Sequence, residues 1–220
     1  MYSNSMIQSN LSRIQAAVAA AAAGRAVKII GASKTVSSER IREAYNTGMR
    51  SFGENRIQEA IPKIENLPDE IEWHFIGHLQ SNKVRDAVRY FSWIHSVDSS
   101  RLLHLIDKEA SKQQKQISIL FEINLGGEET KHGLAPELLK EVLDASGNLD
   151  HVTIRGLMAI PPFFEDADKV RPYFRRLKEL ASTHPSLTEL SMGMSHDYIV
   201  AVEEGATMVR IGTALFGERL

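Results

Sequence analysis

Short apolar runs alternate with longer charged segments along most of this chain. From residue 27 onward, each apolar run precedes a segment whose apolar residues recur at the spacing of an amphipathic helix. That alternation is typical of strand–helix units that build a parallel sheet. The predicted strands are residues 27–33, 50–53, 72–77, 93–97, 117–124, 152–160, 188–192 and 208–211. A first helix is predicted from about residue 37, and the later helices are residues 56–66, 81–90, 99–114, 136–147, 167–183 and 195–204.

The number of strand–helix units predicts the fold class, which is α/β. Eight units in a chain of 220 residues fit a single (β/α)8 barrel, or TIM barrel, at the lower end of its size range. The alternative is an open doubly wound sheet, which more often stops at five or six strands. The strand count favours the barrel. No linker divides the chain, so we expect one domain over residues 1–220.

The N-terminal segment, residues 1–24, is predicted to add one helix outside the barrel. Its alanine-rich run from Ala16 to Ala23 favours a helix, and Gly24 can close it. A secretory signal is disfavoured because the first basic residue is Arg13 and alanine is only weakly apolar. No stretch reaches the roughly 18 apolar residues of a membrane span, so we expect a cytoplasmic protein without a membrane partner.

Composition and charge narrow the candidate functions. The chain has 26 Lys and Arg residues against 28 Asp and Glu, and the resulting net charge of −2 gives no long-range attraction to nucleic acid. It has no cysteine, which excludes disulfide frameworks, thiolate nucleophiles and Cys-ligated metal sites. A nucleophile in this chain must therefore be a serine, threonine, lysine, histidine or carboxylate side chain.

Lys34 is the first candidate, because the functional residues of barrels lie at the carboxyl ends of the strands. It follows the apolar strand 27–33, and the two-residue period places it on the same face as Ile30 and Ala32. A lysine that is partly desolvated there has a lowered pKa and a free amine that can form a Schiff base. The alternative is a solvated lysine that opens the next loop.

Two glycine-containing loops, after the seventh and eighth predicted strands, indicate a phosphate site. These are the two loops with which TIM barrels frequently bind phosphate. Gly193 and Gly212 allow the backbone to approach an anion, and Ser195 is expected to begin a helix whose N-terminus favours negative charge. The first loop starts at Ser191, and Thr213 in the second can add a hydroxyl group. The alternative is that these glycines serve purely geometric turns.

Arg210, Asn55 and two histidines complete the candidates. Arg210 is a permanent charge inside the apolar strand 208–211, so it needs either a structural ion pair or a ligand. Asn55, at the end of the second strand, can orient a ligand by hydrogen bonding. His74 and His78 are four positions apart, but a strand separates such residues widely and no HExxH pattern accompanies them. We therefore expect no metal site.

Seven short motifs mark the predicted strand ends and the loops after them. They are Ala32-Ser33-Lys34-Thr35, Phe52-Gly53-Glu54-Asn55, Trp73-His74-Phe75-Ile76-Gly77, Leu79-Gln80-Ser81-Asn82-Lys83, Gly156-Leu157-Met158-Ala159-Ile160, Leu190-Ser191-Met192-Gly193-Met194-Ser195 and Val209-Arg210-Ile211-Gly212-Thr213. In this order, from about residue 27 to 219, they resemble the pyridoxal phosphate homeostasis protein family. That family is similar in fold to the barrel domain of alanine racemase, a fold-type III barrel.

The resemblance implies a cofactor, pyridoxal 5′-phosphate (PLP), and a role for each of five residues. Lys34 is implied to bind PLP as an internal aldimine. Ser195, Gly212 and Thr213 are implied to hold its phosphate, and Arg210 to face its pyridine nitrogen. The physical arguments above single out the same positions without the resemblance.

Further positions follow from the same resemblance. Lys131 matches a family lysine with an implied secondary role in cofactor handling, and Asn55, Ser191 and Gly193 complete the implied binding residues. Arg56 departs from the family pattern, because a tyrosine is expected after Glu-Asn. The departure affects a stacking or hydroxyl contact there and not the aldimine.

The implied activity is that of a PLP carrier in vitamin B6 homeostasis, with no catalytic residue assigned. An arginine opposite the ring nitrogen disfavours its protonation and weakens the electron sink that a substrate carbanion needs. A racemase also needs a second acid or base, which related enzymes take from an extra domain that we do not expect here. Two alternatives stay open: a PLP-dependent amino-acid racemase or lyase, and a cofactor-independent phosphosugar enzyme. We expect a monomer whose partners are PLP and PLP-dependent apo-enzymes.

Overall fold

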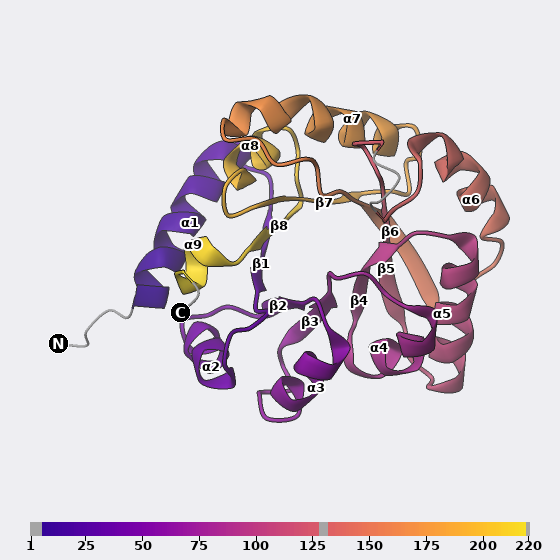
Figure 1. Ribbon diagram of the computed structural model, residues 1–220, viewed down its shortest axis with the longest axis horizontal. Coiled ribbons are helices and arrows are strands. Elements are labelled where there is room, and N and C mark those ends of the chain that lie inside the picture. Colours follow the sequence, from indigo (N-terminus) through magenta and orange to yellow (C-terminus); the bar gives the residue numbers. More distant parts are fainter. Residues whose placement is uncertain (1–5, 128–131, 219–220) are drawn as a thin grey trace.

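A computed structural model describes residues 6–127 and 132–218, and eight parallel strands in this part of the chain close into a barrel. Each strand pairs with its neighbours in the chain, and the last pairs with the first (Figure 1). The strands are β1 Lys28–Ala32, β2 Ser51–Glu54, β3 Glu72–Phe75, β4 Trp93–Val97, β5 Ile117–Glu122, β6 Val152–Met158, β7 Glu189–Met194 and β8 Met208–Ile211. The predicted (β/α)8 barrel is confirmed.

Helices alternate with these strands and form the outer layer (Figure 1). They are α1 Met6–Ala22, α2 Ser38–Asn46, α3 Ile57–Ile64, α4 Val84–Tyr90, α5 Ser100–Lys112, α6 Leu139–Ala145, α7 Arg171–Ser182, α8 Tyr198–Glu203 and α9 Thr213–Phe216. Short 3₁₀ turns precede three of them, at Ser81–Lys83, Pro136–Leu138 and Ala167–Val170. None of the helices in the described residues is long and apolar enough to cross a membrane.

The barrel closes through β1 and β8, which pair in parallel from Lys28 opposite Met208 to Gly31 opposite Ile211. Because each strand runs parallel to the next, the carboxyl ends of all the strands lie at one end of the barrel. We call this end the mouth. The segments after β1, β7 and β8, which the sequence indicates as ligand-binding, therefore border one opening.

One local prediction about the last part of the chain is wrong. The helix expected from Ser195 begins at Tyr198, because Asp197 Oδ1 accepts the N–H of Met194 at 2.6 Å and residues 195–197 form a turn. After β8 the chain adds α9, a single helical turn. Neither helix is long enough to show a helical repeat, so the apolar pattern could not place its ends.

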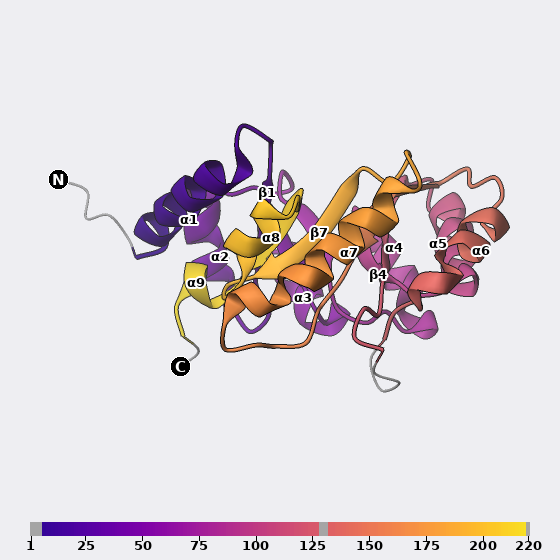
Figure 2. The same ribbon diagram turned by 90° about the horizontal axis from the view of Figure 1, so that it is seen from above.

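Helix α1 covers the outside of the barrel near its closure. Ile7, Leu11, Ile14 and Val18 recur at helical spacing and are buried. Figure 2 shows α1 beside α8, α9 and α2, which it contacts. The helix predicted within residues 1–24 is thus confirmed over Met6–Ala22.

The interior of the barrel is apolar in one part and polar in another. The apolar part is a buried cluster of Ile30, Leu120, Met158 and Met208, with Trp93 packed against it. The polar part is made by buried side chains on β3, β4, β7 and β8, namely His74, His95, Ser191 and Arg210. Buried polar groups need hydrogen-bond partners, so this part constrains the geometry below the mouth.

Candidate functional site

Lys34 lies at the mouth, just after the end of β1. Its side chain is exposed, so the partial burial expected from the two-residue period is wrong. The strand ends at Ala32 and Thr35 adopts a φ of 64°, so the chain turns before the alternation of faces can continue. The Lys34 amine is therefore accessible to a ligand from solvent.

The backbone next to Lys34 is anchored by three side chains. Ser33 Oγ donates to Glu54 Oε1 at 2.7 Å. Lys63 Nζ donates to the same carboxylate oxygen at 2.8 Å and to the Ser33 carbonyl at 2.9 Å. Burial raises the pKa of Glu54, and the hydrogen bonds from Lys63 and Ser33 oppose that rise. The cluster ties the end of β1 to β2 and α3, which fixes the start of the Lys34 turn.

A cavity of about 410 Å³ opens beside Lys34 and extends to the segment after β8. Gly212 and Thr213 line it together with Lys34. The other lining residues are Ala32, Thr35, Val36, Ser37, Arg40, Phe216, Gly217 and Glu218. The structure thus brings the predicted amine and two of the predicted phosphate-binding residues into one cavity of the size that small ligands occupy.

Backbone N–H groups converge on the Ser195 hydroxyl next to this cavity. Gly212 and Ala214 donate their N–H groups to Ser195 Oγ at 3.1 and 3.2 Å. The oxygen accepts both bonds, so its own hydrogen can be donated to an anionic oxygen. Gly193 permits the preceding turn, because its φ is +91° and a Cβ there would lie 2.5 Å from the Ala201 Cβ. The segments after β7 and β8 therefore meet at the Ser195 hydroxyl, whose hydrogen can be donated to a phosphate oxygen.

Arg210 is buried near the end of β8 and bonds neutral oxygens. Nη1 donates to the Ser191 carbonyl at 2.8 Å and to its hydroxyl at 2.7 Å, and Nη2 donates to the Ala159 carbonyl at 3.0 Å. No ion pair joins Arg210 to another described residue. Burial lowers the pKa of Arg210 to about 10, and the charges of Glu122 and Asp197 oppose this. Its Nε–H and one Nη2–H bond none of the described residues, so both can be donated to a ligand.

A chain of hydrogen bonds runs from Arg210 through the barrel interior to Glu72 at the start of β3. The Ser191 hydroxyl oxygen lies 2.9 Å from His95 Nδ1. His95 Nε2 lies 2.9 Å from His74 Nδ1, and His74 Nε2 lies 2.6 Å from Glu72 Oε1. The chain therefore links β3, β4, β7 and β8 below the mouth.

The two ends of this series of hydrogen bonds, Arg210 and Glu72, fix which group donates in each bond. Arg210 can only donate, so the Ser191 oxygen accepts from it and donates its own hydrogen to His95 Nδ1. His95 then donates from Nε2 to His74, and His74 donates from Nε2 to the Glu72 carboxylate. Burial lowers the pKa of both histidines, which agrees with two neutral rings. The ring nitrogens of His74 are both engaged, so it is not a free metal ligand.

His95 is a residue that sequence reasoning missed. It lies in the buried strand β4, and a buried polar side chain needs a polar partner. That signal, beside His74 in the preceding strand, could have indicated a buried pair. Its partners across the barrel depend on closure of the sheet, which the linear sequence does not display.

Within the described part of the chain, five of the predicted binding residues are not among those that line the Lys34 cavity, namely Asn55, Ser191, Gly193, Ser195 and Arg210. Asn55 lines a separate cavity of about 360 Å³ at the ends of β2 and β3, together with His78. The Ser191 hydroxyl is fully buried and is engaged within the hydrogen-bond chain. Ser191 is thus placed to hold Arg210 in position.

Arg56 and Lys131 are the remaining positions that the sequence singles out. Arg56, which stands where a tyrosine is expected, is exposed and pairs with Glu59 at 2.9 Å. Lys131 lies outside the described residues, so its predicted secondary role has no structural counterpart here.

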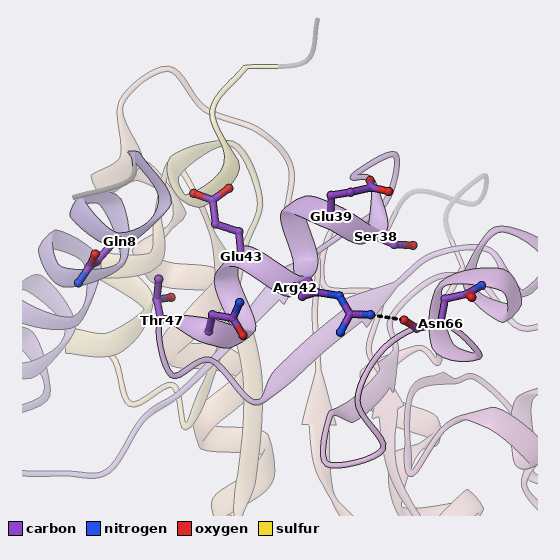
Figure 3. A pocket seen from close by; sticks show the side chains of 8 residues that line it. Gln8, Ser38, Glu39, Arg42, Glu43, Thr47 and Asn66 are labelled. Atoms are coloured by element: carbon purple, nitrogen blue, oxygen red, sulfur yellow. Dashed lines mark hydrogen bonds between the residues drawn. The ribbon is translucent and has the colours of Figure 1, made fainter. Parts of the chain in front are cut away.

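A larger cavity, of about 730 Å³, lies on the outer layer between α1 and α2. Figure 3 shows Arg42 of α2 pointing toward the Asn66 carbonyl, to which it donates a hydrogen bond. Its lining residues are Gln8, Ser38, Glu39, Arg42, Glu43, Asn46, Thr47 and Asn66. None of the candidate residues lines it, and the ligands of barrels bind at the mouth, so the smaller cavity beside Lys34 is the candidate site.

Known proteins are similar to this chain along nearly its whole length. The family described as alanine racemase, N-terminal domain, matches residues 3–220. A pyridoxal phosphate homeostasis protein of Aquifex aeolicus (strain VF5) is 51% identical over 216 residues, which is 95% of each chain. The structure of PipY from Synechococcus elongatus PCC7942 with PLP bound is 40% identical, with a TM-score of 0.87, and the match covers 96% of this chain and 100% of that one.

Alanine racemase itself is a more distant neighbour. The structure of the enzyme from Clostridium difficile 630 is 18% identical, with a TM-score of 0.76, and the match covers 97% of this chain and 56% of that one. At this identity the likeness concerns the fold alone.

The closed barrel and the matching family define a protein with the barrel of the alanine racemase N-terminal class. Within that class, the chain belongs to the pyridoxal phosphate homeostasis protein family. The resemblance carried by the seven motifs is therefore confirmed.

Proposed function

We propose that this chain binds PLP through Lys34 and holds it without turning over a substrate, as part of intracellular vitamin B6 homeostasis. The observation that best supports this is the single cavity lined by the Lys34 amine and by Gly212, whose N–H points to Ser195. An amine and a set of phosphate-type donors match the aldehyde and the phosphate of PLP. The PipY structure contains PLP, and the Aquifex relative is named for PLP homeostasis.

The proposed roles divide between covalent attachment and anion binding. The lone pair of Lys34 Nζ attacks the aldehyde carbon, and the aldehyde oxygen leaves as water when the Schiff base forms. The Ser195 and Thr213 hydroxyls bind the phosphate, and Gly212 lets the backbone approach it. Gly212 leaves room for this, because a Cβ there would meet only Ala32 atoms, at 3.5 and 3.7 Å.

Arg210 is proposed to face the pyridine nitrogen and to keep it unprotonated. The guanidinium remains charged at neutral pH, since its pKa is about 10, and a positive charge disfavours a proton on a neighbouring nitrogen. A pyridine without that proton is a poor electron sink, which disfavours amino-acid chemistry. Three hydrogen bonds inside the barrel keep Arg210 in place. The guanidinium donates them to the carbonyl and the hydroxyl of Ser191 and to the Ala159 carbonyl.

The alternative of a PLP-dependent racemase or lyase needs a second proton-transferring group beside the amine. Among the described residues that line the cavity, none is a tyrosine or histidine, and the one carboxylate is Glu218. We favour a carrier over a racemase or lyase, and we propose that it acts as a monomer and delivers PLP to PLP-dependent apo-enzymes. Steady turnover of any amino acid by the PLP-loaded protein, across a broad panel, would rule out the non-catalytic part of the proposal.

The covalent role of Lys34 is tested by spectroscopy and reduction. The purified chain mixed with PLP is expected to show the near-visible absorption of a Schiff base, and borohydride is expected to fix the cofactor to Lys34. Lys34→Ala should lose both signals. Lys140→Ala is the matched control, because Lys140 is exposed on α6 and pairs only with Asp144 among the described residues. The proposal is wrong if the wild type shows no band, or if Lys34→Ala keeps the band and the label.

The anion-binding role of Ser195 predicts a loss of affinity without a loss of the covalent bond. Ser195→Ala removes one hydroxyl donor and the oxygen on which two N–H groups converge. A hydrogen bond to a charged group contributes about 1.5–3 kcal/mol, so we expect PLP affinity to fall roughly 10- to 100-fold. Titration of the Schiff-base band measures it. Affinity for pyridoxal, which has no phosphate, is expected to stay unchanged, and an equal loss for both compounds would contradict the phosphate assignment.

A further inference from the structure

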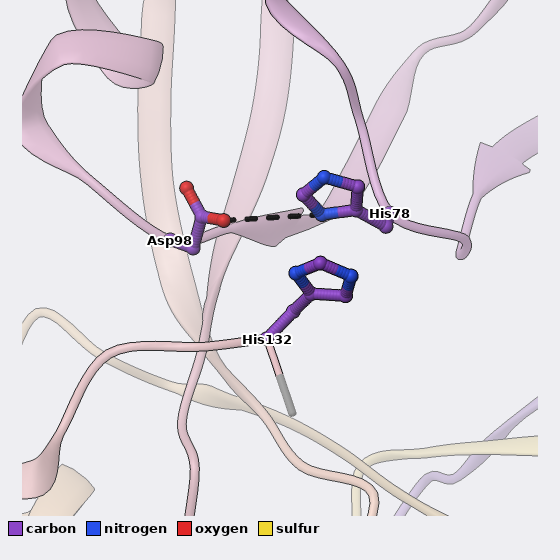
Figure 4. A group of neighbouring side chains, drawn as sticks. All are labelled: His78, Asp98 and His132. Atoms are coloured by element: carbon purple, nitrogen blue, oxygen red, sulfur yellow. Dashed lines mark ion pairs between the residues drawn. The ribbon is translucent and has the colours of Figure 1, made fainter. Parts of the chain in front are cut away.

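Three side chains that can bind a metal ion come together at the mouth. His78 follows β3, Asp98 follows β4, and His132 follows the loop after β5. One ligand atom of each residue lies within 4.8 Å of the others. Figure 4 shows a nitrogen of each imidazole ring on the side that faces the Asp98 carboxylate. We call these three residues the rim triad.

The backbone that bears His78 is anchored on both sides. Ser96 of β4 donates its hydroxyl hydrogen to the Gly77 carbonyl. Gly77 also packs against β2, since a Cβ there would lie 2.2 Å from the Asn55 carbonyl oxygen. His78 therefore starts from a fixed point next to the strand that leads to Asp98.

The backbone that bears His132 is anchored to the end of β5. Leu134 donates its N–H to the Glu122 carbonyl at 2.8 Å and accepts the N–H of Asn124 at 2.9 Å. The intervening Gly133 adopts a φ of +113°, and a Cβ there would lie 2.9 Å from the Asn124 nitrogen. His132 therefore lies only two residues before Leu134, which is hydrogen-bonded to the end of β5.

The Asp98 carboxylate is oriented by its neighbour. Ser99 Oγ donates to Asp98 Oδ1 at 3.1 Å and accepts the Leu102 N–H at 3.3 Å as the N-cap of α5. This leaves Asp98 Oδ2 on the side of His78, 3.9 Å from its Nδ1. That distance is too long for a hydrogen bond, so the two groups do not satisfy each other. An oriented carboxylate beside a histidine is the arrangement that metal sites use.

The two rings of the triad lie face to face. They are stacked at 3.6 Å with an angle of 10° between their planes. Neither ring donates or accepts a hydrogen bond within the described residues, so their nitrogens are available to an ion. An imidazole binds a metal ion through the lone pair of a ring nitrogen.

We propose that His78, Asp98 and His132 bind one divalent transition-metal ion of the zinc class. Two imidazoles and one carboxylate suit zinc, copper, nickel or iron, whereas magnesium and calcium prefer oxygen ligands alone. Zn–N bonds of about 2.0–2.1 Å place tetrahedral ligand atoms roughly 3.3 Å apart. The ligand atoms must approach one another by about 1–1.5 Å from their 4.8 Å limit. The two rings must also turn out of their stack, because one ion cannot lie in two parallel ring planes, and the exposure of both histidines allows this rotation.

The proposed metal site is separate from the Lys34 cavity. The strand order of the closed barrel places β4 and β5 across from β8 and β1, and Figure 1 shows them on opposite sides. The site does not depend on PLP binding.

Zinc binding by the chelator-treated, tag-free chain tests the proposal. Equilibrium dialysis against zinc chloride at pH 7.5 is expected to give one ion per chain. Asp98→Asn and His78→Gln should each lower the affinity at least tenfold. His104→Gln is the matched control, because His104 is another exposed histidine, on α5, and its Nδ1 bonds the Ser100 carbonyl at 2.7 Å.

Further measurements separate the site from nonspecific binding and from the cofactor. Cobalt is expected to give the visible bands of a nitrogen-ligated ion in the wild type and not in Asp98→Asn. Lys34→Ala should keep full zinc stoichiometry, so failure of the PLP proposal leaves this test intact. Circular dichroism checks that each variant is folded. The proposal is overturned if the wild type binds no zinc, or if Asp98→Asn and His78→Gln both bind zinc as tightly as the wild type does.

Discussion

Two histidine pairs show how differently one side chain is used in the interior of this barrel and at its mouth. His74 and His95 are fully buried, their rings meet edge to face at 5.1 Å, and every ring nitrogen has a partner. His78 and His132 are exposed and stacked, and neither donates or accepts a hydrogen bond within the described residues. The first pair is structural, and the second is available to a ligand.

The difference follows from position relative to the strand ends. His74 lies inside β3, where the alternation of faces directs its side chain into the barrel. His78 comes only four positions later, but β3 has ended, so its ring is at the surface. Residue type alone therefore indicates neither role. Burial removes the proton from the first pair and requires partners, whereas exposure leaves the second pair free to exchange protons or bind an ion.

The largest expected difference between the pairs is in stability. His95→Leu keeps a similar volume but leaves the His74 Nδ1 lone pair and the Ser191 hydroxyl without partners inside the barrel. Each unsatisfied buried group costs about 1–3 kcal/mol, so we expect a loss of roughly 4 kcal/mol in the free energy of unfolding. Urea unfolding measures it. His78→Gln at the mouth should change stability by less than about 0.5 kcal/mol, and similar losses for both variants would refute the contrast.

The fold was largely predictable from the sequence because it depends on local alternation. Strands β4 and β8 coincide with their predicted ranges, 93–97 and 208–211, since each is a mostly apolar run bounded on both sides by polar or glycine residues. Lys34, Gly212 and Thr213 were also predictable as neighbours. The carboxyl ends of parallel strands meet at one end of any barrel, so no knowledge of side-chain contacts was needed.

The finer parts of both sites were not predictable, because they depend on contacts across the closed barrel. Ser195 accepts N–H groups from the segment after β8, and that bond forms only once β7 and β8 are paired. His78 was considered with His74, its nearest histidine in sequence, whereas its structural neighbours are Asp98 and His132 from later loops. Sequence spacing measures distance along the chain, and a barrel brings together residues that are far apart along it.

A smaller loss of stability is expected from removing the hydroxyl that joins the buried pair to Arg210. Ser191→Ala leaves His95 Nδ1 without a donor, while Arg210 Nη1 keeps its bond to the Ser191 carbonyl. We expect a cost of about 2 kcal/mol by urea unfolding. Because the two residues share a bond, the double variant with His95→Leu should cost less than the sum of the single changes by more than about 0.5 kcal/mol. If the two losses of stability simply add in the double variant, the hydrogen bonds of Ser191 and His95 do not depend on each other.

The smallest expected difference between the two histidine pairs is in how the free energy of unfolding depends on pH. Burial lowers the pKa of His74 and His95 below the usual 6.5, so the unfolded chain takes up these protons first as pH falls. The unfolded state then binds more protons, and the free energy of unfolding falls by up to roughly 0.7 kcal/mol for each histidine between pH 7 and pH 6. Urea unfolding at both values measures this loss. His95→Leu should remove the share of His95, whereas the exposed pair can be changed to glutamine with little effect. An unchanged pH dependence in His95→Leu would show that folding does not lower the pKa of His95.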